Sequence, residues 1–260
     1  MRVAVVGHVE WGEFARVTRA PAPGEIVHAE DSWEEVGGGG AVAAVQLARL
    51  AGGCLFLTAL GDDELGRRAE RSLEQLGVRV EAAWRPAPQR RAFVHTDAHA
   101  ERTITVLGDR IGPRGGDALP WDELEGADGV YLTAGDPATA QAARRARRLV
   151  ATVRAAGGLA GSKVQLDVLV ASAEDAGERY AAGDLEPEPR LVARSEGGNG
   201  GSLTGRDGKV SRWAAAPLPG LPWTPTEPAT RSRPGSRTGS PKGWDRTRRR
   251  PWEPDAAPHA

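Results

Sequence analysis

Short apolar runs alternate with helix-like segments over the first 220 residues of the chain. Apolar, β-branched runs of about four to eight residues that end at glycine or polar residues are typical of strands buried in a parallel sheet. The first run, at residues 2–6, ends at Gly7 and predicts such a strand. Further strands are expected at residues 54–60, 91–96, 103–107, 129–133, 164–171 and 190–194.

Three segments between these runs predict helices. Residues 41–51 are apolar and rich in alanine, residues 62–76 are amphipathic and stop at Gly77, and residues 137–153 are rich in alanine and arginine. A glycine just past the last apolar position is a common C-terminal cap of a helix. Strands that alternate with helices predict an α/β fold built on a mainly parallel sheet.

A polar turn at residues 97–101 separates the runs at 91–96 and 103–107, so these two runs predict a β-hairpin. The hairpin departs from the alternation of strands and helices in the rest of the chain. If residues 16–30 are also extended, they join the hairpin in a small β-lid beside the main sheet.

Composition excludes several classes of protein. The formal net charge of −1 argues against a dedicated nucleic-acid binder. The single cysteine, Cys54, leaves neither a disulfide framework nor a cysteine-based zinc site. The N-terminal apolar run is too short for a signal peptide, and no stretch reaches the length of a membrane span. We expect a soluble, cytoplasmic protein without nucleic-acid or membrane partners.

The composition changes abruptly near residue 220. Residues 222–260 contain no Val, Ile, Leu, Met or Phe but hold eight prolines. Residues 221–260 carry eight basic and four acidic side chains, a formal charge of +4. Such a segment buries too little apolar surface to offset the entropy lost on ordering. We therefore expect a domain at residues 1–220 and a disordered tail at residues 221–260.

Four consecutive glycines, Gly37 to Gly40, precede the alanine-rich helix. Glycine lets a ligand approach the backbone, and free N–H groups at a helix N-terminus bind polar or anionic atoms. A flexible loop before a packed helix would have the same sequence, so the motif alone leaves both interpretations open. A dinucleotide-binding Rossmann fingerprint would follow the first strand directly, and the residues from Gly7 to Gly12 do not fit it.

Several motifs occur in an order that resembles the ribokinase-like carbohydrate kinases, also called the phosphofructokinase-B family. After the first strand come Pro21-Ala-Pro-Gly-Glu25, the Gly37–Gly40 loop, Thr58-Ala-Leu-Gly-Asp-Asp-Glu-Leu-Gly66, Leu76-Gly-Val78, Glu101-Arg-Thr103 and Ser195-Glu-Gly-Gly-Asn-Gly200. The resemblance covers roughly residues 2–220. It implies a three-layer α/β/α sandwich with a small β-lid, ATP-dependent phosphorylation of a sugar or related polyol, ATP and Mg²⁺ as cofactors, and a homodimer formed through the lid.

The resemblance also assigns binding residues. Glu10 and Gly12 lie where the family carries the Asn and Asp of its sugar-binding Asn-x-Asp, and the adjacent Glu13 could substitute for that Asp. The family's Asn after the glycine loop is replaced by Ala43 and Ala44. The implied sugar-binding residues are Glu10, Glu13, Gly37, Gly38, Gly39 and Gly40, and the implied nucleotide-side residues are Ser172, Asp175, Ser195, Gly197 and Gly200, with Asp175 also near the metal. Residues 172–175 would equally suit a helix-capping turn.

The catalytic signature of the family is missing. Members carry Asp-Thr-x-Gly-Ala-Gly-Asp, in which the last Asp is the base and the Gly-Ala-Gly amides stabilise the transferring phosphoryl group. The 260 residues contain no copy of it. The resemblance therefore predicts an inactive kinase that is truncated at its C-terminus. A non-catalytic binding or regulatory remnant of the same fold is the alternative. Elements lost with the signature would leave sheet faces uncovered, so we expect marginal stability.

A shifted reading frame could encode the missing signature. When residues 223–234 are back-translated and read one nucleotide earlier, the first codon must encode Asp, and the following codons permit Thr-Tyr-Gly-Ala-Gly-Asp. We hypothesise that residues from about 221 onward are an out-of-frame translation of the kinase signature.

Two further groups of side chains are better explained without a ligand. His95, Asp97 and His99 have a spacing that suits a metal but lie in a predicted turn, where solvent is expected around them. The four arginines at residues 144, 145, 147 and 148 predict a solvated helix face rather than a phosphate site.

Overall fold

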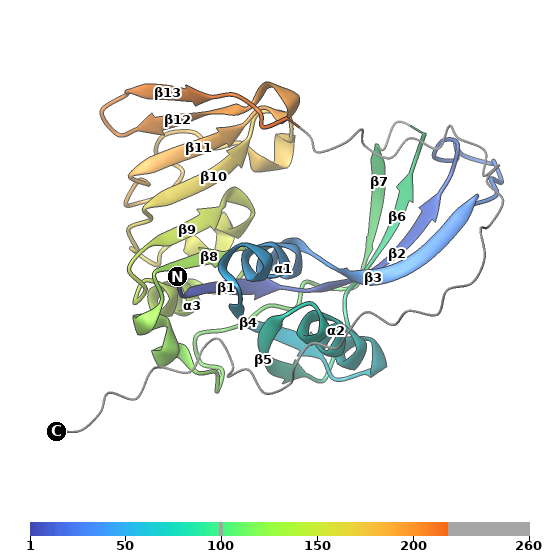
Figure 1. The fold of residues 1–260 in the computed structure, drawn as a ribbon, viewed down its shortest axis with the longest axis horizontal. Coiled ribbons are helices and arrows are strands. Elements are labelled where there is room, and N and C mark those ends of the chain that lie inside the picture. The colour runs from blue at the N-terminus through green and yellow to red at the C-terminus, as the bar shows by residue number, and fades with distance from the viewer. Residues whose placement is uncertain (99–100, 218–260) are drawn as a thin grey trace, which may run out of the picture.

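The computed structural model describes residues 1–98 and 101–217, which form two β-sheets (Figure 1). The larger sheet has nine strands in the order β13-β12-β11-β10-β9-β8-β1-β4-β5. From β5 at one edge through to β11, adjacent strands run parallel, whereas β12 and β13 pair antiparallel at the other edge. The strands are β1 (Val3–His8), β4 (Cys54–Gly61), β5 (Val78–Arg85), β8 (Gly129–Leu132), β9 (Leu149–Thr152), β10 (Val168–Ser172), β11 (Leu191–Ser195), β12 (Gly201–Gly205) and β13 (Val210–Trp213).

The centre of this sheet is buried because β1 and β4 are apolar on both faces. All six residues of β1 and all eight residues of β4 are buried. Parallel pairing sets Ala4 opposite Leu55 and Val5 opposite Phe56. Since side chains alternate along a strand, Val5 and Phe56 enter one hydrophobic core, and Ala4 and Leu55 enter the other.

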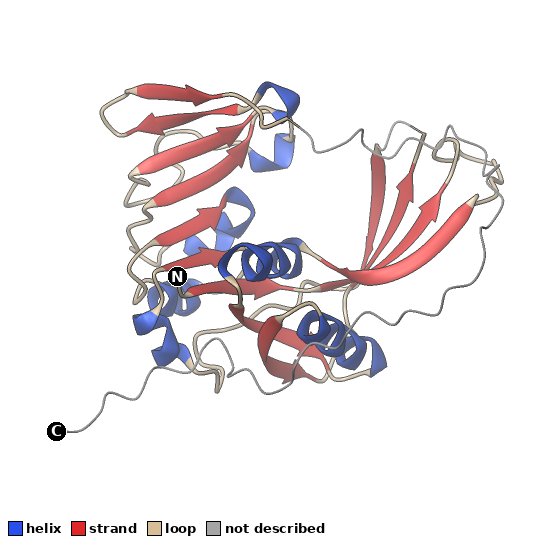
Figure 2. Cartoon of the chain, in the orientation of Figure 1, coloured by secondary structure: helices blue, strands red, loops and turns tan. Residues whose placement is uncertain are grey.

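Helices cover both faces of the large sheet and complete three layers (Figure 2). The helices are α1 (Gly39–Ala51), α2 (Glu64–Gln75), α3 (Pro137–Ala143) and α4 (Ala156–Leu159). The first two pack on the core that contains Val5, and the last two pack on the core that contains Ala4. Short 3₁₀ turns lie at η1 (Trp121–Gly126), η2 (Val153–Ala155), η3 (Ala176–Glu178) and η4 (Gly197–Asn199).

The smaller sheet is the lid, with strand order β3-β2-β6-β7. Its strand β2 follows β1 after a single residue, so the lid extends from the middle of the large sheet (Figure 1). Antiparallel pairing joins β2 to β3 and β6 to β7, and parallel pairing joins β2 to β6. The lid strands are β2 (Glu10–Arg16), β3 (Asp31–Gly37), β6 (Arg91–Thr96) and β7 (Arg102–Leu107).

Most of the fold expected from the sequence is confirmed. The chain is α/β with a mainly parallel sheet, the hairpin forms β6 and β7 of the lid, and helix α2 ends before Gly77, whose φ is 85°. The predicted tail at residues 221–260 lies outside the described residues. No helix within residues 1–98 and 101–217 is long and apolar enough to cross a membrane.

The predicted helix at residues 137–153 is wrong in its second half. Helix α3 ends at Ala143, and residues 149–152 form β9 between β8 and β10. Arg144 turns the chain here, because its guanidinium donates to the carbonyl of Ala146 at 2.8 Å and to the Asp167 carboxylate at 2.6 Å. Burial of Leu149 and pairing on both sides of β9 outweigh the helix propensity of this segment.

The expectation of an extended segment at residues 16–30 is also wrong. The lid is built instead from β2, which ends at Arg16, and β3, which begins at Asp31, and residues 17–30 connect the two strands. Strands β2 and β3 escaped prediction because charged residues interrupt their apolar pattern. Strands β5, β12 and β13 were also missed. In β12 and β13 few residues are buried, so a periodic apolar pattern is absent.

Candidate functional site

A pocket of about 730 Å³ lies between the lid and the carboxyl ends of the large-sheet strands. Its floor comes from the end of β1, and its far wall comes from residues at or just beyond the ends of β8, β9 and β10. The near wall is the inner face of the lid, and the start of α1 closes one side. Ligands of open α/β sheets commonly bind at the carboxyl ends of strands.

The lid contributes an apolar wall. Alternate residues of its strands face the pocket, among them Gly12, Phe14, Val94 and Ile104. A side chain at Gly12 would not fit, because a Cβ there would lie 2.4 Å from Cε2 of the Phe14 ring. Glycine therefore leaves room for the Phe14 ring, which stacks on Trp33 of β3 with ring centroids 5.1 Å apart. This wall can cover the carbon skeleton of a ligand and exclude water from it.

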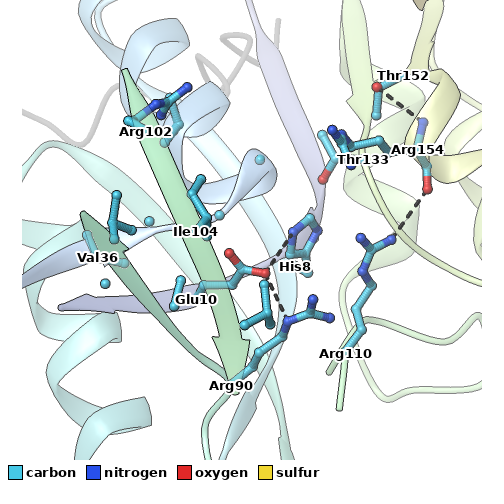
Figure 3. Close-up of a pocket in the computed structure, with 18 of the residues that line it drawn as sticks. His8, Glu10, Val36, Arg90, Arg102, Ile104, Arg110, Thr133, Thr152 and Arg154 are labelled. Atoms are coloured by element: carbon cyan, nitrogen blue, oxygen red, sulfur yellow. Dashed lines mark hydrogen bonds and ion pairs between the residues drawn. The ribbon is translucent and has the colours of Figure 1, made fainter. Parts of the chain in front are cut away.

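The floor of the pocket is polar and charged (Figure 3). The Glu10 carboxylate lies 2.9 Å from Nε of Arg90 and 3.9 Å from Nε2 of His8. His8 is buried at the end of β1, and its pKa falls from 6.5 to about 4. Burial is the main cause, and the positive charges of Arg110, Arg90 and Arg154 add to it. His8 is therefore a neutral imidazole at pH 7.

The glycine run shapes the junction between the lid and α1. Gly37 ends β3, Gly38 has a φ of 87° that disfavours side chains, and α1 begins at Gly39. A Cβ at Gly40 would lie 2.6 Å from the His8 carbonyl oxygen, so glycine allows α1 to pack directly on β1. Gly37, Gly38 and Gly39 line the pocket, whereas Gly40 is buried beneath it.

The far wall carries an ion-paired arginine. Arg154, in η2, contacts the carboxylate of Glu178 at 2.5 Å and also pairs with Asp175. Its backbone carbonyl accepts a hydrogen bond from Nη1 of Arg110 at 3.4 Å. The hydroxyls of Thr133 and Thr152 belong to the same wall (Figure 3).

The residues expected on the nucleotide side come together at the carboxyl ends of β10 and β11. Parallel pairing sets Ser172 opposite Ser195. A Cβ at Gly197, which has a φ of 54°, would lie 2.8 Å from a carboxylate oxygen of Glu174. Gly200 packs on the backbone after β13, where a Cβ would lie 2.1 Å from the carbonyl of Trp213. Of the five predicted residues, Asp175 alone lines the pocket.

The turn at residues 172–175 has the hydrogen bonds of a capping turn. The Ser172 hydroxyl accepts the backbone N–H of Asp175 at 3.1 Å, and the Asp175 carboxylate accepts the N–H of Gly177 at 2.7 Å. These bonds favour the capping interpretation that the sequence left open, and they leave the nucleotide role of these residues a prediction.

The predicted role of Asp175 at a metal meets an obstacle in the structure. Its carboxylate is already shared between Arg154 and the start of η3. Within residues 1–98 and 101–217, no three His, Cys, Asp or Glu side chains gather in a way that could hold a metal ion. The metal role of Asp175 stays a prediction, because Mg²⁺ is usually held by only one or two carboxylates together with substrate phosphates.

Glu13 does not reach the pocket. It lies one residue beyond Gly12 on β2, so its side chain is on the opposite face of the lid, where it contacts Nη1 of Arg91 at 3.1 Å. The proposed substitution of Glu13 for a sugar-binding Asp therefore does not agree with the structure. Glu10, which is on the inner face, lies in the pocket, but its carboxylate is engaged by Arg90.

Sequence reasoning missed the pocket's most distinctive polar groups: His8, Arg90, Arg110 and Arg154. His8 was placed beyond the end of the predicted first strand and given no role, and the three arginines fell outside every motif. Of the four arginines in the predicted solvated helix face, Arg144 is half-buried and pairs with Asp167, whereas the other three are exposed as expected. All four lie beyond the end of α3 at Ala143. His95 packs edge-on against Phe93, and its suggested partner His99 lies outside the described residues.

The chain is similar to known proteins over most of its length. The model of the pfkB family carbohydrate kinases matches residues 1–181. An ATP-dependent ribose-1-phosphate kinase from Halopiger xanaduensis is 29% identical over 150 residues, which cover 56% of this chain and 50% of that protein. The chain thus spans about half the length of this curated relative.

Solved structures share the fold. A ribokinase from Thermotoga maritima superimposes with a TM-score of 0.65 at 22% identity, over 84% of this chain and 79% of that one. The ribokinase of Arabidopsis thaliana, solved with ribose and ATP, superimposes with a TM-score of 0.61 at 19% identity, over 85% of this chain and 80% of that one.

Proposed function

We propose that this chain, which belongs to the pfkB family of carbohydrate kinases, binds a sugar in the pocket that the kinase fold provides. The activity proposed for the fold is ATP-dependent phosphorylation of a hydroxyl on a sugar or related polyol. One observation carries the proposal: the pocket is enclosed by an apolar lid on one side and by polar groups at the carboxyl ends of β1, β8, β9 and β10 on the other.

The described residues suit a polyhydroxylated ligand. The Glu10 carboxylate and the backbone around Gly38 and Gly39 offer hydrogen bonds to hydroxyl groups, and the lid excludes water from the apolar side. ATP, when bound, would supply the phosphoryl group. We propose the turn from Ser195 to Gly200 as the ATP site, because Gly197 and Gly200, which adopt positive φ angles, carry no side chain that would cover their own backbone.

We further propose that the 260-residue chain does not turn over as a kinase. The Asp-Thr-x-Gly-Ala-Gly-Asp signature, which would supply the base, is absent from its sequence. The carboxylates at the sheet side of the pocket do not replace it, because Glu10 pairs with Arg90 and both Asp175 and Glu178 pair with Arg154. Each of these carboxylates already has a guanidinium partner, which competes with a sugar hydroxyl for its oxygens.

A non-catalytic binding or regulatory module is the second candidate. It is favoured by the pocket that described residues between His8 and Glu178 form without any contribution from the missing signature. Ligand binding therefore does not require the missing signature, whereas phosphoryl transfer does.

The experiment compares binding with turnover on the purified 260-residue protein. A panel of pentoses, hexoses and polyols is screened by thermal shift, and ADP release is followed with each sugar and MgATP. We expect at least one sugar to raise Tm without sugar-dependent ADP release. Sugar-dependent ADP release would contradict the proposed inactivity, and the absence of any shift across the panel would contradict the binding function.

A pair of glycine variants locates the binding. Gly12→Ala places a methyl group against the Phe14 ring and should abolish the shift, whereas Gly116→Ala, which has open space around it, should preserve it. Equal shifts in both variants would place the sugar elsewhere.

Sequencing the genomic DNA across codons 210–260 tests the proposed frame change. An extra or missing base there would restore the signature in a longer reading frame, and that longer protein is then expected to be an active kinase. If sequencing confirms the present reading frame, the 260-residue chain is a kinase remnant.

A further inference from the structure

We propose that Gln89 is a positioning residue, which fixes the base of the lid and the polar floor of the pocket against the large sheet. The inference rests on the proposed function, because the sugar would lie between that floor and the lid. Gln89 itself does not line the pocket, so it acts through the segments that its side chain joins.

Gln89 is a buried polar residue at the base of the lid, two positions before β6 begins. It is 3% exposed. Its side-chain oxygen accepts the backbone N–H of Gly61 at 3.0 Å, and its side-chain nitrogen donates to the carbonyl of Val9 at 2.9 Å. Since one partner is a donor and the other an acceptor, the amide fits in a single orientation. Buried polar groups whose hydrogen bonds are made give rigidity to the segments they join.

Val9 is the junction between the two sheets. It is the single residue between β1 and β2, and it is fully buried. The parallel pairing of β2 with β6 starts beyond it, where the N–H of Trp11 donates to the carbonyl of Arg90 at 2.9 Å. The Gln89 amide binds the Val9 carbonyl just before this ladder begins. The side chain thus continues the pairing of the two lid segments down to their junction with the large sheet.

The other contacts of Gln89 attach the lid base to the large sheet. Gly61 ends β4, which is buried along its whole length. Asp63, the N-cap of α2, accepts the backbone N–H of Gln89 at 2.8 Å. A Cβ at Gly61 would lie 2.4 Å from the Gln89 nitrogen, so glycine allows the connection from β5 to β6 to lie against the end of β4. Gln89 therefore joins the lid junction to a fully buried strand.

The polar groups of the pocket floor lie one residue beyond this attachment. Glu10 follows Val9, Arg90 follows Gln89, and the Glu10 carboxylate lies 2.9 Å from Nε of Arg90 (Figure 3). The inner face of β2 then continues from Glu10 through Gly12. Because binding sites require their groups to be held within about 0.5 Å, a shift at Gln89 would disturb the floor and the lid wall together.

The described contacts elsewhere on the lid are weaker candidates for this role. Every residue of β7, at the outer edge of the lid, is exposed. On the outer face, Arg68 of α2 contacts the Glu34 carboxylate at 2.8 Å, and its guanidinium lies 4.4 Å from the Trp11 ring centroid. The Arg68 and Glu34 side chains are both exposed, and exposed ion pairs contribute little to stability. The buried amide of Gln89 is the better anchor.

The test compares two matched variants of the full chain by hydrogen exchange at single residues and by sugar binding. Gln89→Met removes the amide and keeps the length of the side chain. Gln165→Met makes the same change at a half-buried glutamine in the connection between α4 and β10. The Gln165 amide donates to the Glu188 carbonyl at 2.7 Å and accepts from Arg206 at 2.8 Å. The control therefore also loses hydrogen bonds between segments, but outside the lid.

We expect the backbone N–H groups of Gly61 and Trp11 to exchange about tenfold faster or more in Gln89→Met, while β8 and β9 keep their rates. The sugar found in the thermal-shift panel should bind Gln89→Met about tenfold more weakly or worse, and Gln165→Met within about twofold of the unmodified chain. Gln89→Asn keeps the amide but is one methylene shorter, so it cannot reach both partners. It should give the same pattern and replaces Gln89→Met if that variant does not fold.

Unchanged sugar affinity in the Gln89 variants would overturn the proposal, whatever the exchange rates, and would leave the proposed function intact. Equal losses of affinity in Gln89→Met and Gln165→Met would also overturn it, because the loss would then reflect stability rather than lid position. If the unmodified chain binds no sugar, the proposed function fails. In that case unchanged exchange at Gly61 and Trp11 would overturn the role of Gln89, and faster exchange confined to the lid base would support it.

Discussion

The centre of the large sheet and its β11–β13 edge are packed very differently. In β1 and β4 every residue is buried, whereas every residue of β13 is exposed and β11 has no buried residue. Leu57 in β4 is fully enclosed, but Leu191 in β11 is 39% exposed and Trp213 in β13 is 40% exposed. Both regions belong to one continuous hydrogen-bonded sheet, so strand pairing by itself does not bury a strand.

Helix cover accounts for the difference. Helices α1 and α2 pack along β1, β4 and β5, with α1 crossing the first two and α2 the last two. After α4, the part of the chain that the structure describes contains only the three-residue turns η3 and η4 as helical elements. Parallel strands are stable when both faces are covered. The comparison teaches that the pocket is anchored on its better packed side, where β1 and α1 hold His8 and the glycine run.

A matched pair of leucines gives the largest expected contrast. Leu57→Ala removes a side chain with no exposed surface and should lower the free energy of unfolding by about 3 kcal/mol or more, because a cavity is left in the core. Leu191→Ala makes the same chemical change at a half-exposed position and should cost less than about 1 kcal/mol. Urea unfolding measures both values. Equal losses would mean that the far end of the sheet is packed as tightly as the centre.

The stability of the packed side should also depend on pH through His8. Its pKa is about 4 in the folded chain and 6.5 without the fold, since burial and three arginines disfavour the imidazolium. Below pH 6.5 the unfolded chain binds a proton that the folded chain excludes. This contribution is therefore complete above pH 6.5 and is lost as the pH falls toward 4.

The fall of the His8 pKa from 6.5 to about 4 corresponds to roughly 3 kcal/mol of unfolding free energy, at about 1.4 kcal/mol per pKa unit. Urea unfolding between pH 4.5 and 7.5 measures it, and His8→Gln should flatten the curve. His28→Gln, at an exposed histidine, is the control and should leave the curve unchanged. Residues 101–217 contain no histidine, so the effect belongs to the first half of the chain. A His8→Gln protein with the full pH dependence would refute this account.

Two aspartates give the smallest expected difference in stability loss on substitution by alanine. Asp63 accepts the N–H of Gly66 at 2.8 Å and the N–H of Gln89 at 2.8 Å, so it caps α2 and ties it to the lid connection. Asp63→Ala should cost about 1–2 kcal/mol. Asp207 accepts the N–H of Lys209 at 3.1 Å in the exposed turn between β12 and β13, and Asp207→Ala should cost less than about 0.5 kcal/mol. Thermal melts rank the two variants by their loss of stability. A larger loss for Asp207→Ala would contradict the difference in packing between the centre of the sheet and its β11–β13 edge.

An element was predicted correctly where its own residues carry a clear hydrophobic pattern or a cap. Strands β1 and β4 and helix α2 were predicted within a few residues, because an unbroken apolar run or an amphipathic stretch with a capping glycine fixes each of them. Strand β9 failed because Leu149–Thr152 follows an arginine-rich helix without a glycine or proline between them. Its pairing with β8 and β10, which the local sequence does not encode, decides its structure.

The site was predictable only where it coincided with a motif. Gly37, Gly38 and Gly39 were expected beside a ligand and do line the pocket, and Glu10 lies there as well. Glu13 was misplaced because the phase of β2 was unknown, and a shift of one residue moves a side chain to the other face. The homodimer through the lid and the nucleotide role of Ser172, Ser195, Gly197 and Gly200 stay predictions.

The sequence by itself determined the fold class, the family resemblance and the absence of the catalytic signature, because each is written in adjacent residues. Only the tertiary structure decided that Arg90, Arg110 and Arg154 surround His8. These four residues lie between 20 and 146 positions apart, and they meet because the order of the sheet places β8 and β9 beside β1 while the lid folds over the same edge. Short-range patterns specify helices and strands, whereas long-range pairing specifies which of their ends share a pocket.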